Sequence, residues 1–481
     1  MVVILYKKTN NFKSFLPTKS FGTIINIEKL TEVFNMTIYI PKDVQNIINI
    51  IEAHGHSAYI VGGCVRDAIM GRTPHDYDIC TSALPDEILE MFKHRKVIET
   101  GLKHGTVTVQ GDNDYYEVTT YRVDGEYTDG RHPDAVMFVD DVVADLSRRD
   151  FTINAMAYNV RTGLVDPFHG YNDIKDGLIK CVGNPVNRFN EDALRIMRAV
   201  RFAATCNFKI HQDTHDAMLS LRHLLAHVSE ERKTTEFCKM LVCADKDLLL
   251  TYRDIFATFI PELTTTFDFK QNNPHHIYDV YEHMVTAVTN APQDLYIRLA
   301  LMFHDIAKPL TYTEDEALVG HFYGHAELGA NMAKNIMKRM RMDNNTIAIV
   351  SELVVSHDMQ VSTSLKTVRR MVSKMGEKQT RRLIAVMRAD KLAQSNHPGT
   401  LNNLEILKVM EYNIDIVTEN NECFTLKNLA INGHDLITLG IVDGKLIGKT
   451  LNYLLDIVLS EPEKNVKHIL MELALNFAKI T

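Results

Sequence analysis

Two aspartates, Asp76 and Asp78, are separated by one tyrosine and follow shortly after the run GGCVRD. Because side chains alternate between the faces of an extended strand, both carboxylates point to one side if this segment is a strand. Adjacent carboxylates repel each other unless a cation lies between them, and hard oxygen ligands favour Mg²⁺. The Gly-Gly turn lets backbone N–H groups approach a phosphate, and Arg66 can add a bidentate contact. An isolated Asp-x-Asp is usually a solvated turn, but the joint pattern predicts a site for a metal-bound triphosphate.

Two further polar runs could handle a nucleotide. RRDFTINAMAYN continues as a helix-like run, in which the arginines suit triphosphate oxygens and Asp150 and Asn154 suit a ribose. Asp150 could equally be only a helix cap. In NEDALRIMRAVRFAA, four side chains recur every three residues and would form a slanting stripe on a helix: Asp192, Arg195, Arg198 and Arg201. Asp192 accepts and Arg195 donates, so the two can read the base edge of cytosine or adenine, or can form only a surface ion pair worth under ~1 kcal/mol.

A separate series of histidines and aspartates occurs farther along the chain: His283, His304, Asp305, His325, His357 and Asp390. Its centre is RLALMFHDIAKP, where the adjacent His304 and Asp305 offer two metal ligands beside an apolar segment. Imidazole suits Mn, Ni, Fe or Zn, and carboxylates suit harder ions. One core histidine is common, but an ordered series predicts a metal centre. A degenerate scaffold without metal is the alternative.

Residues 59–81, YIVGGCVRDAIMGRTPHDYDICT, resemble the head motif of the class II nucleotidyltransferases. That family comprises the CCA-adding tRNA nucleotidyltransferases and the bacterial poly(A) polymerases, within the DNA polymerase β superfamily. The family's RRD-x-x-x-N and ED-x-x-R patterns are also matched, the latter by Glu191, Asp192 and Arg195. The resemblance implies that the ED-x-x-R residues form a protein template that selects CTP or ATP. It also implies nucleotide contacts from Gly63, Arg66, Arg149, Arg198 and Arg201.

The histidine–aspartate series is similar to that of the HD-superfamily phosphohydrolases. Some CCA-adding enzymes carry such a domain, with phosphatase or cyclic phosphodiesterase activity. The resemblance therefore implies a second divalent metal in this region, in addition to the Mg²⁺ expected at the paired aspartates.

Other segments have both a functional and a plain interpretation. Residues 121–136 are rich in glycine and charge, and CCA-adding enzymes have a flexible loop at this place that helps the switch from CTP to ATP. Arg131 is the residue of interest there, although a solvated arginine fits equally well. Glu117 is a candidate third carboxylate for the metal. Residues 426–459 resemble the tRNA-binding tail of bacterial CCA-adding enzymes, although a plain helix-turn-helix also fits their expected Gly-Lys turn of Gly440, Gly444, Lys445, Gly448 and Lys449.

The elements needed to position these residues fit an α+β fold. The resemblance implies a small α/β nucleotidyltransferase head, polymerase β-like, followed by all-helical neck, HD and tail domains. Apolar residues at helical spacing predict an amphipathic helix within residues 37–57. Alternation, or richness in Val, Thr and Tyr, predicts strands at 58–61, 77–81, 106–110, 115–122 and 135–139, with none after about residue 176. A helix is expected between strands at 85–93. The expected parts are an N-terminal extension (1–35), the head (36–175), the neck with the template helix (176–265), the HD domain (266–410) and the tail (411–481).

The composition fits a multidomain globular protein. The chain has 481 residues, 45% of them hydrophobic, and a formal net charge of −8, so any RNA contact must use local basic patches. Its 7 cysteines form no C-x-x-C pair, which argues against a zinc–cysteine site and favours a reducing cytoplasm. We find no apolar run of the ~18 residues needed to cross a membrane. Residues 1–35 put their apolar run before the lysines, unlike a secretory signal, and are expected to be dispensable.

The combined prediction is Mg²⁺-dependent addition of CCA to the 3′ end of tRNA from CTP and ATP, without a nucleic-acid template. A bacterial poly(A) polymerase is the nearest alternative. Partial enzymes that add only CC or only A are a further variant. An HD-domain phosphohydrolase is the alternative of another class. The expected partners are tRNA, CTP and ATP, with no membrane, and the oligomeric state is left open.

Overall fold

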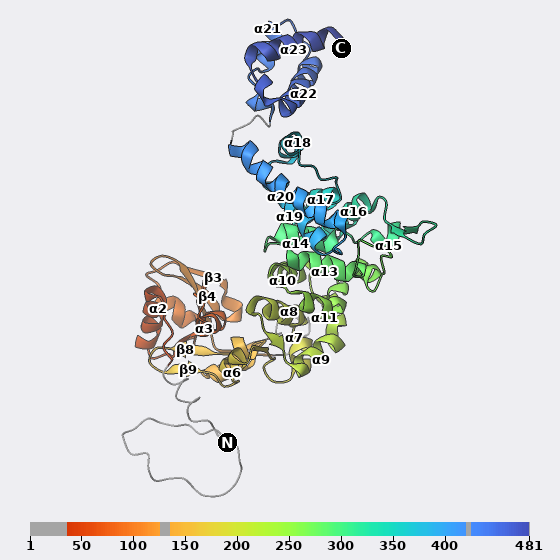
Figure 1. Ribbon diagram of the computed structural model, residues 1–481. Helices are drawn as coiled ribbons and strands as arrows, with labels where there is room; N and C mark the ends of the chain where they lie inside the picture. Colours follow the sequence, from red (N-terminus) through yellow and green to blue (C-terminus); the bar gives the residue numbers. More distant parts are fainter. Residues whose placement is uncertain (1–35, 126–134, 420–424, 481) are drawn as a thin grey trace, which may run out of the picture.

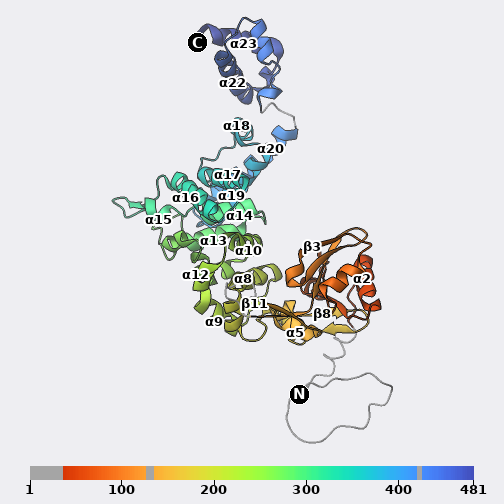
Figure 2. The same cartoon turned by 180° about the vertical axis from the view of Figure 1, so that it is seen from behind.

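The computed structural model describes residues 36–125, 135–419 and 425–480. The predicted extension 1–35 and the loop residue Arg131 lie outside the described residues. The chain is elongated, with the head and neck at one end and the C-terminal helices at the other (Figures 1 and 2). No helix in the described ranges is both long and apolar enough to cross a membrane.

The head is built on one mixed seven-stranded sheet in the order β3-β4-β5-β2-β1-β8-β9. Its strands are β1 (Ala58–Val61), β2 (Asp78–Thr81), β3 (Val97–Gly101), β4 (Thr106–Gln110), β5 (Tyr115–Thr120), β8 (Ala157–Asn159) and β9 (Gly163–Val165). β1 runs antiparallel to β2 with Val61 opposite Asp78, and β5 runs parallel to β2 on its other side. The strand that carries Asp78 therefore lies in the middle of the sheet.

Short helices and one separate hairpin complete the head. They are α2 (Lys42–Ala53), α3 (Gly63–Ile69), α4 (Pro85–Met91), α5 (Val142–Ser147) and α6 (Gly170–Lys175), and the hairpin of β6 (Arg122–Asp124) and β7 (Val136–Phe138). In α2 the four predicted apolar positions are fully buried: Val44, Ile47, Ile48 and Ile51. β1 and β4 begin and end at the predicted residues, whereas β2 begins one residue later than predicted, at Asp78.

The segment after the double arginine differs from its prediction as a helix-like run. Residues Thr152–Asn154 form a single 3-10 turn, and β8 begins at Ala157 and pairs with β1. Asp150 therefore caps no α-helix in this segment. Every residue from 151 to 159 is buried, so this run shows no alternation that would reveal β8 in the sequence.

The rest of the described chain is mainly helical. The neck contains α7 (Pro185–Glu191), α8 (Leu194–Cys206), α9 (Gln212–Leu221), α10 (Glu230–Cys243), α11 (Lys246–Thr251) and α12 (Arg253–Ala257). The following region contains α13 (Val280–Asn290), α14 (Leu295–Phe303), α15 (Lys308–Thr311), α16 (His325–Arg339), α17 (Asn344–Ser356), α18 (Leu365–Met375), α19 (Glu377–Leu392) and α20 (Pro398–Glu419). The last helices are α21 (Gly433–Thr438), α22 (Gly444–Ser460) and α23 (Lys467–Ile480).

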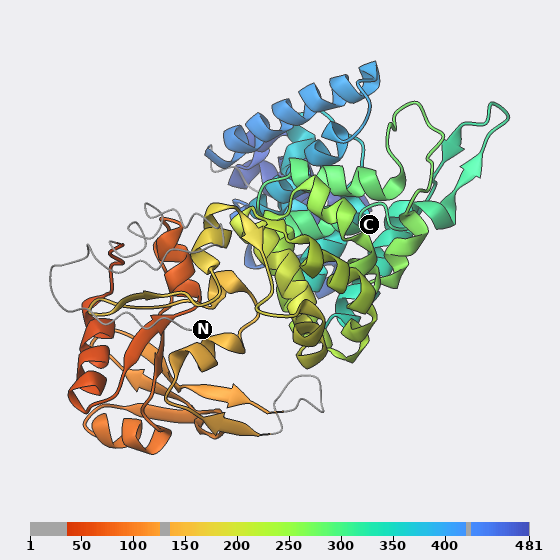
Figure 3. The same ribbon diagram turned by 90° about the horizontal axis from the view of Figure 1, so that it is seen from below.

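Two small strand pairs interrupt this helical region, where none was predicted. β10 (Leu178–Ile179) pairs with β11 (Lys209–Ile210), and β12 (Thr313–Glu314) pairs with β13 (Gly320–His321). Each strand is only two residues long, too short to give an alternating pattern in the sequence. The β12–β13 hairpin projects from the helical body, as Figure 3 shows from below.

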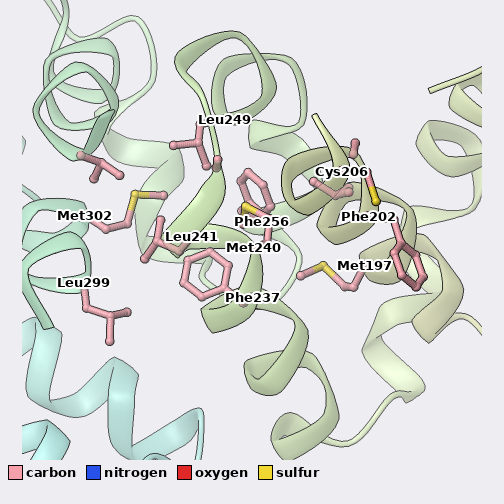
Figure 4. Packing of buried hydrophobic residues seen from close by; sticks show 14 of the residues in the cluster. Met197, Phe202, Cys206, Phe237, Met240, Leu241, Leu249, Phe256, Leu299 and Met302 are labelled. Atoms are coloured by element: carbon pink, nitrogen blue, oxygen red, sulfur yellow. The ribbon is translucent and has the colours of Figure 1, made fainter. Parts of the chain in front are cut away.

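One continuous apolar core joins the head, the neck and the helices that follow, whereas the last three helices have a core of their own. In Figure 4, Phe237 and Met240 of α10 lie between Met197 of α8 and Leu299 of α14. All four side chains are fully buried. The neck helix α8 is therefore fixed both to the head and to the following helices by close packing.

Candidate functional site

The paired carboxylates lie at the start of the central strand β2. Asp78 is its first residue and Asp76 lies in the bend before it, and both are exposed while Tyr77 between them is buried. Burial of part of the carboxyl and the neighbouring Asp76 raise the pKa of Asp78 to about 6, against the opposing effect of Arg149. Glu117, on the adjacent strand β5, raises this pKa further. Excess negative charge from oxygen ligands is the environment that fits a divalent cation.

The glycine turn before α3 is shaped around Arg149. Gly62 has φ +80°, and a Cβ there would lie 2.8 Å from Nη1 of Arg149. Nε of Arg149 is buried without a hydrogen-bond partner, and its Nη2 lies 3.7 Å from Oδ2 of Asp145. Arg149 thus keeps donors for an anion beside the carboxylate pair. Arg66, by contrast, donates to Asn154 Oδ1 at 2.7 Å, so the two family motifs are joined by a side-chain contact.

Asp150 connects the head to the neck helix α8. Its Oδ2 accepts from Nε of Arg198 at 2.8 Å, and its Oδ1 accepts from Asn154 at 3.2 Å. Burial by itself would raise the pKa of Asp150, but Arg198 and Asn154 outweigh burial and lower it to about 2. The buried carboxylate is therefore ionised and holds α8 in place, whereas the sequence suggested a ribose contact or a helix cap.

The predicted base-reading pair lies at the start of α8. The helix begins at Leu194, so Asp192 precedes it in extended conformation and accepts the Leu194 N–H at 3.0 Å. The expected four-residue stripe on one helix is therefore wrong for Asp192, and only the three arginines lie on α8. Asp192 lies in the break between α7, which ends at Glu191, and α8.

Asp192 and Arg195 each contact another side chain instead of one another. Asp192 Oδ2 accepts from Nη2 of Arg232 at 2.7 Å. Arg195 Nη1 donates to Glu191 at 2.7 Å, and its Nη2 donates to the carbonyl oxygen of Arg148 at 3.1 Å. The alternative prediction, a surface ion pair between Asp192 and Arg195, is not among the described contacts of these two residues. Both base-edge groups are held by partners from α7, α10 and the head.

Two further candidate functional residues, Arg232 and Phe202, were not predicted from the sequence. Arg232 on α10 fixes Asp192, and the only local signal for it is the charge-dense run from Glu230 to Lys233. Phe202, on α8, is buried and lies beneath the guanidinium groups of three predicted nucleotide-contact residues, with carbon-to-centroid distances of 5.0, 5.2 and 3.7 Å for Arg66, Arg198 and Arg201. An aromatic face attracts cations, so this ring gathers the arginines.

The histidine–aspartate series meets around the buried Asp305 carboxylate. Nε2 of His283 and Nε2 of His304 each lie 3.2 Å from Oδ2. Nε2 of His325 and Nε2 of His357 lie 3.5 and 3.6 Å from Oδ1. Two overlapping groups could each hold an ion, and both use the same carboxylate: His283, His304 and Asp305 in one, and Asp305, His325 and His357 in the other.

The hydrogen bonds around this cluster orient the imidazole rings as metal ligands are oriented. In His304, His325 and His357, Nδ1 lies 2.7 Å from the carbonyl oxygen three residues earlier. Nδ1 therefore carries the proton, which leaves the Nε2 lone pair for a ligand. Asp390, the last predicted ligand, places Oδ1 3.0 Å from Nε2 of His283.

The Asp305 carboxylate itself lacks directed partners. Neither oxygen accepts a hydrogen bond of good geometry, although Nζ of Lys308 lies 2.6 Å from Oδ2. Burial raises the pKa of this group, but His304 and Lys308 outweigh burial and hold the pKa well below its usual range. An ionised, buried carboxylate with unsatisfied oxygens among imidazole nitrogens fits a divalent metal. A cavity of about 740 Å³ opens onto the cluster.

The predicted Gly-Lys turn of the tail is only partly a turn. Gly440, with φ +86°, follows α21, but the other four residues lie in the first two turns of α22. The carboxylate of Asp443 already accepts the Lys445 N–H at the start of this helix. The local geometry is therefore that of a capped helix pair, the plain alternative.

Three parts of the chain match models of known protein families. The Poly A polymerase head domain matches residues 58–180, a probable RNA and SrmB- binding site of polymerase A matches 207–266, and the HD domain matches 275–395. The CCA-adding enzyme of Oceanobacillus iheyensis is 49% identical over 194 residues, which are 40% of this chain and 48% of that protein. That of Lactococcus lactis is 44% identical over 244 residues, 50% of this chain and 59% of that protein. The chain thus spans about half the length of the curated relatives it matches.

Solved structures match over a longer range. The CCA-adding enzyme of Bacillus stearothermophilus in complex with CTP is 26% identical, covers 91% of this chain and 98% of its own, and has a TM-score of 0.66. The enzyme of Thermotoga maritima complexed with tRNA is 20% identical, with coverages of 92% and 100% and a TM-score of 0.56, a likeness of fold alone. The predicted α+β class and the predicted family resemblance are confirmed.

Proposed function

We propose that this chain, a class II nucleotidyltransferase head joined to an HD domain, adds CCA to the 3′ end of tRNA from CTP and ATP without a nucleic-acid template. The main support is a chain of contacts from the carboxylates to the neck. Arg149 acts on Asp78 electrostatically, and the next residue, Asp150, holds Arg198 of α8. The phosphate-handling and base-reading elements are thereby connected through adjacent residues. The curated and solved relatives that are named CCA-adding enzymes support the same activity.

In the proposed reaction the 3′-hydroxyl of tRNA attacks the α-phosphate of the nucleotide, and pyrophosphate leaves. Asp76 and Asp78 would hold divalent ions, which we take to be Mg²⁺. When bound, Mg²⁺ activates the hydroxyl and neutralises charge on the leaving oxygens. Gly63, at the start of α3, Arg66 and Arg149 position the triphosphate, and Arg149 has the unpartnered donor for it.

Asp192 and Arg195 would read the base. Arginine donates to the acceptor edge of cytosine or adenine, and aspartate accepts from the exocyclic amino group that both bases carry. The partners that hold these two side chains, Arg232 and Glu191, support a fixed template rather than two freely rotating side chains. Arg198 and Arg201 would contribute positive charge beside the nucleotide.

A poly(A) polymerase on the same fold is the nearest alternative. Incubation with tRNA that lacks CCA, with CTP as the only nucleotide, distinguishes the two activities. We expect CTP incorporation. No incorporation of CTP, together with incorporation of ATP, would favour the poly(A) activity.

A second activity is favoured by the buried cluster around Asp305. We propose that residues 275–395 hold divalent metal and hydrolyse a phosphoester, since unsatisfied carboxylate oxygens and Nδ1-anchored histidines support a metal centre there. The ligands would be His283, His304, Asp305, His325, His357 and Asp390. Hydrolysis that survives Asp78→Ala but is lost in His304→Ala would support this activity, and the reverse result would contradict it.

The remaining assignments follow from the same proposal. We propose that residues 411–481 contact tRNA as a tail, that the head, neck and HD domain end near residues 175, 265 and 410, and that the protein acts in the cytoplasm. Binding of tRNA by variants that lack positive charge at Lys445 and Lys449, both exposed on α22, tests the tail. Unchanged affinity and salt dependence would contradict a tail contact through these lysines.

A further inference from the structure

An exposed aromatic pair lies at the mouth of the cavity that opens onto the Asp305 cluster. Tyr323 is 78% exposed, and its ring stacks on that of His321 with a centroid distance of 5.4 Å and an interplanar angle of 10°. Both residues line the cavity together with the predicted ligands His325 and His357. An exposed tyrosine that packs against a parallel ring on one face presents its other face to a ligand.

The surrounding hairpin holds this pair in place. Nε2 of His321 lies 2.9 Å from Oδ2 of Asp315, and Asp315 also accepts the N–H groups of Ala317 and Val319 within the hairpin. The strand β13 is anchored in turn, because the Gly320 N–H donates to the Asn272 carbonyl at 2.8 Å. A Cβ at Gly320 would lie 2.3 Å from the carbonyl oxygen of Gln271, so the close approach requires glycine. The His321 ring of the stacked pair is thus fixed by several independent contacts.

The same short segment orients a metal ligand. The carbonyl oxygen of Phe322 lies 2.7 Å from Nδ1 of His325, which is the contact that aims Nε2 of this histidine at the cluster. Tyr323 stands between these two residues in the chain. A ligand that stacks on Tyr323 therefore lies beside the metal centre at a position that the backbone fixes.

The charges in the cavity indicate which kind of molecule fits. Its lysines, Lys308 and Lys391, are already paired with Asp305 and Asp390 at 2.6 and 3.0 Å. No arginine lines this cavity in the part of the chain that the structure describes. Neutral amides and two further carboxylates line it instead: Asn273, Gln394, Asn402 and Asn403, with Glu327 and Asp358. Such a surface suits a nucleoside with one phosphate and lacks the positive side chains that a triphosphate requires.

We propose that Tyr323, supported by His321, is the base-stacking residue of a binding site for a nucleoside monophosphate or a nucleic-acid end with one terminal phosphate. The phosphate faces the Asp305 cluster, and the amides of Asn402 and Asn403 accept and donate hydrogen bonds to the sugar and base. Aromatic stacking suits any base, because every base has a π face. The proposal rests on the proposed phosphoester hydrolysis for its catalytic meaning, but not for binding.

A binding experiment can test the site independently of hydrolysis. The chain contains no tryptophan, so the Tyr323→Trp variant has a single tryptophan, at the stacking position. Fluorescence excited at long wavelength therefore reports on this ring alone. We expect adenosine 3′-monophosphate to quench its fluorescence saturably and ribose 5-phosphate to leave it unchanged. Tyr412→Trp is the matched control, because Tyr412 is 65% exposed on α20 and lies outside the cavity. Equal quenching of both variants, or no quenching at position 323, would overturn the proposal.

A comparison of kcat/KM for substrates with and without a base separates the stacking role of Tyr323 from the proposed hydrolysis. With Mn²⁺ present, Tyr323→Ala is expected to lower kcat/KM for adenosine 3′-monophosphate roughly 5- to 150-fold, mainly through KM, and Tyr323→Phe to retain it. Hydrolysis of glycerol 2-phosphate, which has no base, should be unchanged in both variants. Equal losses with both substrates would overturn the stacking role. If the unaltered protein hydrolyses neither substrate, the proposed hydrolysis fails, and the tryptophan experiment alone decides the binding site.

Discussion

Arg232→Ala should weaken the choice of base without removing nucleotide addition. Arg232 donates to Asp192 at 2.7 Å, and the two side chains are only 23% and 15% exposed, so the contact is partly shielded from water. A hydrogen bond between charged groups contributes about 1.5–3 kcal/mol, and we expect the lower end because the Leu194 N–H still holds the carboxylate. A loss of about 1.5 kcal/mol corresponds to roughly tenfold lower discrimination.

The assay compares kcat/KM for CTP with kcat/KM for UTP on a tRNA that lacks CCA. The ratio should fall about tenfold in Arg232→Ala, because a misdirected carboxylate no longer accepts reliably from the cytosine amino group. Arg381→Ala is the matched control, since Arg381 forms an ion pair with Asp415 at 2.8 Å in the region after the neck. Its ratio should stay unchanged.

Two outcomes would refute this reasoning. An unchanged CTP-to-UTP ratio in Arg232→Ala would show that Asp192 does not depend on this partner. An equal loss with both nucleotides, together with a lower melting temperature, would assign Arg232 to the stability of α10 rather than to base choice.

Three further predictions concern other parts of the site. Because its folded-state pKa of about 2 lies below the ordinary value of 3.8, ionised Asp150 stabilises the protein by about 2 kcal/mol above pH ~4, and this stabilisation is lost as the pH falls through ~2. Urea unfolding of Asp150→Asn should therefore show a constant deficit from pH 7 to 5 that shrinks only below pH ~4, and a gap that closes near pH 6 would contradict it. Gly62→Ala should cost about 1–3 kcal/mol of stability and most nucleotide addition, because it strains a positive φ and displaces Arg149, and wild-type unfolding and activity would refute this. Asp305→Asn should abolish calorimetric Mn²⁺ binding by residues 275–395 while nucleotide addition continues, and undiminished Mn²⁺ binding would disprove a shared carboxylate.

The sequence predicted the elements whose patterns are local. β1 and β4 have the predicted ends, and the apolar face of α2 is buried as expected, because alternation and helical spacing are short-range signals. The run after Arg149 differs from its prediction because residues 151–159 are all buried, and a continuously buried run has no alternation to mark a turn and a short strand. The minor strands β12 and β13 were missed because two residues give no pattern.

Side-chain partners were the least predictable part of the site. The contact of Asp192 with Arg232 joins residues 40 positions apart on different helices, and nothing in either local motif indicates it. The same holds for Asp150 and Arg198, which lie 48 positions apart, since the motif around Asp150 fits a ribose contact as well as a structural one. The order of the histidine–aspartate series predicted a cluster, but the shared position of Asp305 between two histidine pairs emerges only in three dimensions.

The proposed addition of CCA to tRNA is tested most directly by an assay with tRNA that lacks CCA. This tRNA is incubated with CTP alone, with ATP alone and with both nucleotides. We expect two additions from CTP and a terminal adenosine only when both nucleotides are present. The Asp76→Ala/Asp78→Ala double variant should give no product while its fold stays intact by circular dichroism. Long ATP-only products, or full activity in the double variant, would contradict the proposed addition.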